Sequence, residues 1–505
     1  MMLVAQEFAA PSVEWWHISP IIALVSGALL LLVLGALTPT WPRGAYAWLT
    51  ALTAFVAGGL ALFQWRAIED DGPATLLSGA LAFDALTQFV TITICAATLL
   101  VALVTADDLY ESGNDGPEVY ALMLVSATGG VVMAAANDLI VLFLGLETLS
   151  LALYVLAASD RRRTDSQEAG IKYFVLGSFA SAFFLYGAAL VYGGTQSTNI
   201  TEIVSAFQGS VLVDGQDSLV LAGIALLMVG LGFKVAAVPF HVWTPDVYQG
   251  APTAVTAFMA SVGKAAAFAA MVRVLVIALP FHRDDWGPAV WVLAVLSLVI
   301  GSVLAVVQGD VKRMLAYSSI NHAGFILVGV EAASHRAGET QLGDAIPSVT
   351  TYLLLYAVLT VGSFAIVAVV ARQSGGDTSI DAFDGLSGRQ PLLALALTIL
   401  LLAQAGVPLT AGFVAKWGVI QAAVEEGSYT LAVIAMVTAV VGAFVYLRVM
   451  VAVWLRDGEA VAAAGERVPF MTGLAVFATA AFTMVIGVWP QWLLGAADQV
   501  TAYAR

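Results

Sequence analysis

Four of the five lysines in this chain fall inside long apolar segments, and this placement suggests proton chemistry. Lys172, Lys234, Lys264 and Lys416 lie in predicted membrane spans. A lysine near the centre of a lipid-embedded helix costs about 2.5–3.5 kcal/mol on insertion scales. An arginine stays charged almost everywhere, whereas a buried lysine can lose its proton near neutral pH. These lysines are therefore candidates for groups that take up and release protons.

Glu147 is an acidic residue that is also expected to lie deep inside a membrane span. It lies about ten residues from either end of its predicted span, 137–158, out of reach of the membrane surface. A carboxyl in hydrocarbon can ionise beside a lysine, and Lys234 is the predicted partner. Two such groups titrate as a pair. The alternative is a fixed ion pair that holds two helices together, although buried pairs stabilise poorly once desolvation is counted.

The other three lysines differ in depth. Lys264 lies among small residues that allow helices to approach closely, and we expect it to be a central relay; the alternative is snorkelling to an interface. Lys416 follows a predicted helix break and is the expected exit site. Lys172 is only a few residues inside its span, so snorkelling to the surface explains it about as well as a function does.

Two histidines join the list of candidate relay residues. His241 is seven residues beyond Lys234 and could bridge towards Lys264. His322 sits midway along its predicted span, in the sequence AYSSINHAGF. Histidine titrates near neutrality, which suits a relay. A neutral, hydrogen-bonded histidine is the alternative for each.

The elements that must position these residues are membrane helices. The chain has 505 residues, of which 60% are hydrophobic and 11% charged, against about a quarter charged in soluble domains. Apolar runs of about 18 residues or more recur from end to end, so we predict an all-α polytopic membrane protein that forms a single transmembrane domain over residues 1–505. About fourteen spans are expected, at residues 18–38, 45–66, 79–105, 118–135, 137–158, 168–193, 217–247, 251–280, 288–308, 312–334, 347–373, 391–427, 429–456 and 468–492.

Two of the spans are too long for one straight crossing, and each contains a helix breaker. The span 217–247 contains Pro239, and the span 391–427 contains Gly406, Pro408 and Gly412. The broken span is the fourth in each of two units of five, residues 118–280 and 288–456. Because five is odd, the second unit would be inverted relative to the first. Interrupted segments at matching positions indicate the working site of a transporter.

The distribution of basic residues predicts the orientation. Ten fall on one side, which we expect to face the cytoplasm: Arg43, Arg161, Arg162, Arg163, Lys312, Arg313, Arg372, Arg389, Arg456 and Arg467. Four fall on the other side: Arg66, Arg283, Arg336 and Arg505. Both termini are therefore expected outside. The first span follows a start with no lysine or arginine and is expected to be a retained helix rather than a secretory signal.

Charge and cysteine content exclude other classes. The net charge of −15 does not suit nucleic-acid binding and is attributed to solvated loops. Cys95 is the only cysteine, so no disulfide and no cysteine-based zinc or iron–sulfur site forms within the chain. No metal site or bound cofactor is expected. Electrons in any associated redox reaction would run through other subunits.

Several long stretches resemble the antiporter-like membrane subunits of respiratory complex I, the NADH–quinone oxidoreductase. The matching stretches, spread over about three hundred residues, are FLGLETLSLALYVL, IKYFVLGSFASAFFLYGAALVYG, GFKVAAVPFHVWTPDVYQGAPT, GDVKRMLAYSSINHAGF and GVPLTAGFVAKW. Within this family the form WTPDVYQGAPT is most similar to subunit N. The resemblance implies fourteen helices, two inverted five-helix repeats and a central axis of buried charges.

The resemblance also implies a function and a set of partners. Glu147 and Lys234 would form the input pair, Lys264 the central relay and Lys416 the residue near the exit; Lys172, His241 and His322 match the family less decisively. The chain would translocate protons across an energy-transducing membrane, expected to be the bacterial inner membrane, driven by quinone reduction elsewhere in the enzyme. NADH, FMN, iron–sulfur clusters and quinone would bind to other membrane and peripheral subunits. The alternatives are a subunit of a multisubunit Na⁺/H⁺ antiporter and a membrane scaffold that carries no protons.

Overall fold

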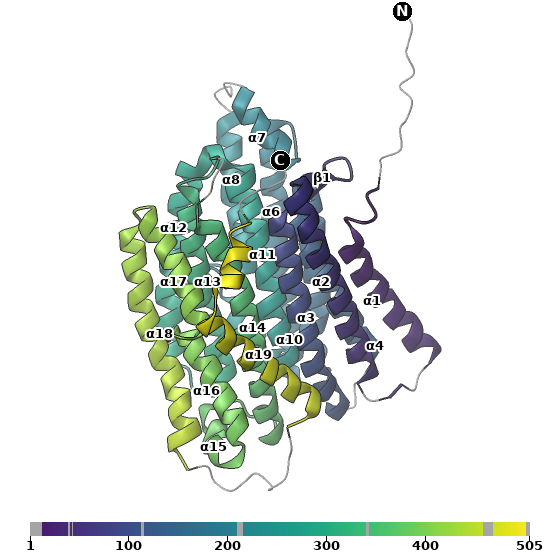
Figure 1. The fold of residues 1–505 in the computed structure, drawn as a ribbon, viewed down its shortest axis with the longest axis vertical. Coiled ribbons are helices and arrows are strands. Elements are labelled where there is room, and N and C mark those ends of the chain that lie inside the picture. The colour runs from purple at the N-terminus through teal and green to yellow at the C-terminus, as the bar shows by residue number, and fades with distance from the viewer. Residues whose placement is uncertain are drawn as a thin grey trace, which may run out of the picture.

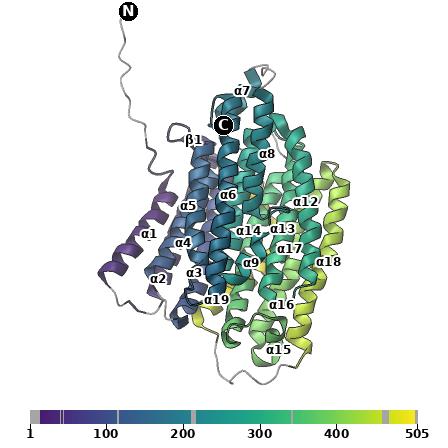
Figure 2. The same ribbon diagram turned by 180° about the vertical axis from the view of Figure 1, so that it is seen from behind.

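Long helices that run side by side make up almost all of the structure. The computed structural model describes residues 13–38, 41–42, 44–112, 116–209, 216–339, 343–457 and 468–500. In both views α1 and α18 lie at opposite edges of the bundle (Figures 1 and 2). Helices suit hydrocarbon because every backbone polar group is paired within the segment. The predicted class, an all-α polytopic membrane protein, is confirmed.

Twelve helical segments of the described residues are long and apolar enough to cross a membrane. They are α1 (Ser19–Leu37), α2 (Ala45–Asp71), α3 (Ala85–Ser112), α4 (Pro117–Ala135), α5 (Leu139–Ala157), α6 (Thr164–Thr195), α8 (Gln216–Val235), the run α10–η2 (Thr253–Ala278), the run η3–α12 (Pro280–Val306), α14 (Ala345–Gln373), α18 (Tyr429–Leu455) and α19 (Phe470–Val488). The run α10–η2 consists of α10 (Thr253–Phe258), the π-helical η1 (Met259–Gly263), α11 (Lys264–Met271) and the π-helical η2 (Val272–Ala278). The next run consists of η3 (Pro280–His282) and α12 (Arg283–Val306).

Two further predicted spans also form helices. The span predicted at 312–334 is one partly polar helix, and the span predicted at 391–427 is two helices separated by a break. α13 (Val311–Ser334) carries a polar stretch in its first half and is buried along most of its length. α16 (Pro391–Ala405) and α17 (Ala411–Glu425) are separated by a short break, as are α8 and α9 (Trp243–Gly250). Both breaks fall at the predicted prolines, Pro239 and Pro408. The shorter elements are α7 (Ile200–Gly209), η4 (Ile380–Phe383), α15 (Leu386–Arg389) and α20 (Gln491–Ala497).

Some predicted boundaries were wrong. Residues 79–84, assigned to the third span, belong instead to an antiparallel hairpin of β1 (Ala74–Leu76) and β2 (Leu81–Phe83). α3 begins only after Asp84, whose carboxylate accepts a hydrogen bond from the backbone N–H of Thr87 (2.9 Å). The last span ends at Val488, before Pro490. Hydropathy detects the apolar run but not the capping residue that starts a helix or the proline that follows its end.

The two ends of the bundle differ in charge. One end, called the basic end below, carries the residues Arg161, Arg162, Arg163, Lys312 and Arg372, which line a common cavity. The opposite end carries α7 and the β1–β2 hairpin (Figure 1). Three residues used to predict the orientation, Arg43, Arg467 and Arg505, lie outside the described residues.

The same helix start occurs twice, at α5 and at α13. The Asp138 carboxylate caps the first turn of α5 and accepts a hydrogen bond from the Thr198 hydroxyl (2.7 Å). The Asp310 carboxylate caps the first turn of α13 and accepts one from the Thr378 hydroxyl (2.5 Å). Each aspartate also forms an isolated β-bridge with the residue after that threonine. Because α5 ends and α13 begins at the basic end, these two matching structures lie at opposite ends of the bundle.

Candidate proton path

Lys234 lies at the end of α8, where the helix breaks. Its side chain is only 7% exposed. The ammonium donates hydrogen bonds to the Ser150 hydroxyl (2.7 Å) and the Tyr173 hydroxyl (3.2 Å). A cation is favourable at the C-terminus of a helix because the last carbonyls carry partial negative charge. The break thus supports a buried charge that an unbroken span would not.

Glu147 lies one turn before Ser150 on α5 and is half-buried. The hydroxyl of Ser181, on α6, donates a short hydrogen bond to its carboxylate. Within the described residues no ion pair joins Glu147 to Lys234, although their charges are close enough to interact. The structure therefore brings the two predicted partners near each other without a direct contact: Lys234 donates to Ser150, whereas Glu147 accepts from Ser181.

Lys264 is held on the next element, in a helix with π-helical turns on both sides. Its side chain is 2% exposed. The ammonium donates to the Ser319 carbonyl and to the Ser319 hydroxyl (2.5 Å), and it lies 5.3 Å from the centroid of the Tyr356 ring. Tyr356 in turn donates to the Ser319 hydroxyl (2.8 Å). π-Helical turns are common at functional sites, where they turn a side chain away from its regular helical direction.

His322 is the centre of a buried network of neutral polar side chains. Its Nδ1 lies 2.7 Å from the Tyr352 hydroxyl and its Nε2 lies 3.3 Å from the Tyr446 hydroxyl. Tyr446 also shares a hydrogen bond with Ser318, which precedes the Lys264 ligand Ser319 on α13. Two contacts extend the network to the break after α16: Ser318 donates to the amide oxygen of Gln404, and the Gln404 amide donates to Ser363 (2.6 Å).

Lys416 lies on the far side of this second break. It is 6% exposed and donates to the carbonyl of Ala405 (3.0 Å), one of the carbonyls that the end of α16 leaves unpaired. Its ammonium lies 4.8 Å from the centroid of the Phe325 ring. Gly406 is required beside it, because its φ is +88° and a Cβ would lie 2.8 Å from the lysine Cδ. The predicted combination of break and lysine is therefore a single local structure.

Aromatic rings surround the path beside Lys234. The ammonium of Lys234 lies 5.9 Å from the centroid of the Tyr154 ring and 5.3 Å from that of Tyr173. Tyr173 stacks on Trp243 at 4.6 Å between centroids, and Trp243 contacts Tyr248 edge-on at 6.0 Å. The Tyr248 hydroxyl in turn interacts with Ser319, the residue that binds Lys264. We call these four aromatic residues the aromatic section.

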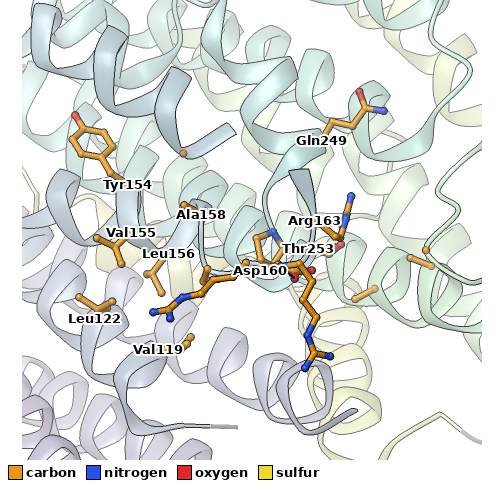
Figure 3. A pocket seen from close by; sticks show the side chains of 18 of the residues that line it. Val119, Leu122, Tyr154, Val155, Leu156, Ala158, Asp160, Arg163, Gln249 and Thr253 are labelled. Atoms are coloured by element: carbon orange, nitrogen blue, oxygen red, sulfur yellow. Dashed lines mark hydrogen bonds between the residues drawn. The ribbon is translucent and has the colours of Figure 1, made fainter. Parts of the chain in front are cut away.

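A cavity leads from the basic end towards Lys234. It has a volume of about 1170 Å³ and is lined by the three consecutive arginines Arg161, Arg162 and Arg163 and, at its inner wall, by Tyr154. In Figure 3 Tyr154 and Leu122 lie at the left, and Gln249 and Thr253 lie further to the right. Because the ring of Tyr154 contacts the ammonium of Lys234, one residue separates the cavity from the first buried lysine.

Two predicted site residues lie away from this chain of contacts. Lys172 is 41% exposed and forms ion pairs with Glu168 (2.7 Å) and Asp246 (2.9 Å), and Asp246 also pairs with Arg313 (2.8 Å). His241 is half-buried in the break after α8, and its Nδ1 is buried with no hydrogen-bond partner among the described residues. No contact among the described residues joins His241 to Lys234 or Lys264. Neither residue is brought together with the buried lysines.

Sequence reasoning missed several polar residues of the site. Tyr352, Tyr356 and Tyr446 resemble apolar core residues in a hydropathy pattern, and Gln404 carries no charge. A usable signal for Gln404 was its position two residues before the breaking Gly406, since Lys234 also lies two residues before its break, at Ala236.

A fully buried ion pair was also missed. Arg273, in η2, forms a two-pronged ion pair with Asp84 through contacts of 2.9 and 2.7 Å. The guanidinium also donates to the Thr87 hydroxyl (2.7 Å) and the Ala134 carbonyl (2.6 Å). The partners are remote in sequence, so no local pattern reveals the pair.

The fold and these contacts define a polytopic helical membrane protein with titratable side chains buried at mid-depth. Residues 136–442 match the family described as NADH:quinone oxidoreductase/Mrp antiporter, TM, and the chain belongs to this family. It is 40% identical to NADH-quinone oxidoreductase subunit N 3 of Streptomyces griseus, over 99% of this chain and 96% of that protein.

Solved structures agree with this assignment. A chain of respiratory complex I from Thermus thermophilus is 33% identical with a TM-score of 0.78, over 95% of this chain and 99% of that one. A chain of the Mrp complex from Dietzia shares the fold, with a TM-score of 0.81 and 20% identity, over 97% of each chain.

Proposed function

We propose that this chain is a proton-translocating membrane subunit of an NADH–quinone oxidoreductase. The relationship to subunit N over nearly the whole chain supports the enzyme complex. The observation that carries the translocation is the set of three lysines, Lys234, Lys264 and Lys416, each at most 7% exposed and each held by hydroxyl or carbonyl oxygens at a helix irregularity. Such intramembrane cations are costly and mark ion pathways.

The proposed path runs from the basic end through the three lysines. Protons would enter by the large cavity, pass Tyr154 and reach Lys234, near Glu147. Water molecules would carry them past the aromatic section to Lys264. From Ser319 the path would continue into the neighbouring network around His322 and Gln404, and from there to the second break, where Lys416 lies. Lys172 and His241 would act at the edge of this path.

The finer architecture belongs to the same proposal. With α13 and the broken α16–α17 counted as crossings, the described residues form fourteen. The matching caps at Asp138 and Asp310 support two inverted units, at residues 118–280 and 288–456, because they lie at opposite ends of the bundle. A second match supports the units: Arg273 donates to the carbonyl of Ala134 in the first, and Arg448 to that of Val306 (2.8 Å) in the second.

Orientation, partners and cofactors follow from this assignment. The basic end would face the cytoplasm across a bacterial inner membrane, so α1 would begin on the outer side. Other complex I subunits and membrane lipid would cover the exposed apolar faces of the bundle. Within the described residues no group of three or more histidine, cysteine, aspartate or glutamate side chains could hold a metal ion. NADH, FMN, iron–sulfur clusters and quinone would bind to other subunits.

A subunit of a Na⁺/H⁺ antiporter is the second candidate. The fold shared with a chain of the Mrp complex favours it. The higher identity to subunit N, 40% against 20%, favours the oxidoreductase. A neighbourhood of genes for quinone-binding and NADH-oxidising subunits would support the first assignment, and one of small antiporter subunits would support the second.

Replacement of two lysines tests whether the chain translocates protons. We expect Lys234→Ala and Lys416→Ala to lower the number of protons taken up by inverted membrane vesicles per NADH oxidised, while the complex still assembles. Acidification would be followed with a pH-sensitive dye, and assembly by native gel electrophoresis. Wild-type pumping with both lysines replaced would leave the scaffold interpretation.

A further inference from the structure

We propose that Glu331, with His335 and Ser428, forms a proton-release site at the opposite end of the bundle. The inference rests on the proposed function and extends it beyond Lys416. Glu331 lies near the end of α13, and its side chain is only 5% exposed. No part of the path described above uses this carboxyl group.

The contacts of Glu331 favour a role in proton transfer over a role in holding the fold together. One carboxylate oxygen, Oε1, accepts a hydrogen bond from Ser428 (2.8 Å) and lies 3.2 Å from Nε2 of His335. The other, Oε2, is buried and has no hydrogen-bond partner among the described residues. A buried carboxyl group with an unpaired oxygen is costly, so a fold that needed only an anchor would not retain it.

A cavity connects this carboxyl group to the surface. The cavity has a volume of about 410 Å³ and is lined by Glu331, His335 and Ser428 together with Arg283 and Asp284 at the start of α12. The volume is large enough for several water molecules. His335 is 42% exposed, so it joins the buried carboxyl group to solvent. A proton on Glu331 therefore has an acceptor and a hydrated space beside it.

Two arginines near the cavity are already engaged, and Asp284 is exposed to solvent. Arg283 donates to the carbonyls of His335 and Ala337 (3.1 Å each). Arg336 forms a short ion pair with Glu426. These contacts hold the chain around the cavity but leave Oε2 of Glu331 unpaired, so Glu331 is the buried acid that remains available to a proton.

Two helices connect the site to the proposed path. α13 carries His322 and, nine residues later, Glu331, which places the two about 14 Å apart along the helix axis at 1.5 Å per residue. α17 carries Lys416 and ends beside Ser428. Between these levels the helices pack closely: a Cβ on Gly329 would lie 3.1 Å from a methyl group of Val419.

This apolar contact between α13 and α17 would separate Lys416 from the release site at Glu331. A path that stayed wet from Lys416 to the surface would let protons return from the positive side. A dry section between Lys416 and Glu331 prevents that return, and a water molecule admitted when the helices separate would carry the proton across. A transient file of water relays the proton from the Lys416 ammonium, which becomes a neutral amine, to the Glu331 carboxylate. The Glu331 carboxyl group then loses the proton through His335 or water into the cavity and becomes a carboxylate again.

Replacement of Glu331 in the assembled complex tests the release site. We expect Glu331→Gln to lower the protons taken up by inverted vesicles per NADH oxidised to the value of Lys416→Ala, and Glu331→Asp to restore most of it. The matched control is Glu425→Gln, which removes an exposed carboxylate at the end of α17 and should pump like the wild type. A protonated-carboxyl band that Glu331→Gln removes from the infrared difference spectrum, and that Glu425→Gln retains, would identify the group as titrating.

The outcomes separate this inference from the proposed function. Wild-type pumping by Glu331→Gln together with a loss in Lys416→Ala would overturn the release site and leave the proposed function intact. Wild-type pumping by both variants would contradict the proposed function and the release site with it.

Thiol labelling tests the access of the cavity without relying on activity. Cys95 is the only cysteine of the chain and is 2% exposed, so the wild-type chain is a low background. Ser334→Cys places a thiol in the Glu331 cavity, and the control Thr253→Cys places one in the cavity at the basic end. A membrane-impermeant maleimide should label Ser334→Cys in spheroplasts and Thr253→Cys in inverted vesicles. Labelling of both from the same side would refute the release site.

Discussion

The two helix breaks of the bundle have the same backbone pattern and differ in charge. In the first, α8 ends in a left-handed residue, Ala236, and the next N–H bonds back to the carbonyl of Gly232 (2.8 Å). In the second, α16 ends in the left-handed Gly406, and the next N–H bonds back to the carbonyl of Leu402 (3.1 Å). The two helix breaks therefore have the same hydrogen-bond pattern. The residue two positions before the left-handed one is Lys234 in the first half and Gln404 in the second.

A second pair of matching positions also has a charged residue on one helix and an uncharged residue on the other. The ninth residue after the capping aspartate is Glu147 on α5 and Ser319 on α13. The first half thus places a carboxylate and a cation where the second half places a hydroxyl and an amide. The lysine at the second break lies beyond it instead, at Lys416. In the proposed path the two breaks would therefore serve differently: the first as a charged cluster at the entry, and the second as a neutral network that leads towards Lys416.

The largest expected effect concerns the arginine that both halves contain. Arg273 and Arg448 donate to matching carbonyls, but only Arg273 has a fully buried carboxylate partner, Asp84. Asp84→Ala should destabilise the protein by about 3–5 kcal/mol, because it leaves a buried cation without its anion. The thermal stability and yield of the purified complex would measure this.

The matched variant in the other half should cost much less. Arg448→Met removes a single hydrogen bond of a half-buried side chain, worth about 1–3 kcal/mol. Equal losses in Asp84→Ala and Arg448→Met would mean that the ion pair adds nothing to the common scaffold.

Lys234→Gln places at the first break the residue type that Gln404 supplies at the matching position of the second break. We expect the complex to assemble and oxidise NADH, while proton uptake per NADH falls to the level of Lys234→Ala, since an amide does not carry a proton as an ammonium does. Lys234→Arg should fail as well, because a guanidinium keeps its proton. Proton uptake in inverted vesicles would measure both variants, and normal uptake by Lys234→Gln would contradict the comparison.

Gln404→Leu tests the neutral network at the second break. The change keeps the volume but leaves the hydroxyls of Ser363 and Ser318 without the amide, which should cost about 1–3 kcal/mol and slow pumping in part. Gln421→Leu, an exposed glutamine on α17, is the control and should change stability by no more than about 0.5 kcal/mol. Thermal unfolding of the purified complex would compare the two, and equal stability would argue against a structural role for the amide network.

Lys172→Ala should have the smallest effect. Its ion pairs with Glu168 and Asp246 are partly exposed, and such pairs contribute about 0–1 kcal/mol. Proton uptake per NADH should remain close to that of the wild type. A loss as large as that of Lys234→Ala would place Lys172 on the path after all.

The sequence predicted the helices and the buried cations well because both leave local signals. An apolar run of about twenty residues defines a span, and a lysine or proline within it is conspicuous, as at Lys234 with Pro239 and at Lys416 with Pro408. What failed was the identity of partners. Lys234 donates to Ser150, three residues after Glu147 on α5, and the described residues form no direct ion pair between Glu147 and Lys234.

The tyrosines of the network illustrate the same limit. Tyr352, Tyr356 and Tyr446 come from two helices that meet α13 only in the folded bundle, and their hydroxyl groups are invisible to a hydropathy pattern. Asp84 and Arg273 are likewise brought together by packing alone. Spacing along the chain gives the depth of a residue in the membrane but not its neighbours.

The aromatic section has a consequence for ion selectivity. A sodium ion entering between Tyr154, Tyr173, Trp243 and Tyr248 would have to exchange its hydration shell for ring faces and a few tyrosine hydroxyls, of which that of Tyr173 already accepts a hydrogen bond from Lys234. A proton needs only a transient file of water molecules that exchange covalent and hydrogen bonds. The same rings that hold the ammonium of Lys234 would thus act as a dehydration barrier that admits protons and turns away metal ions.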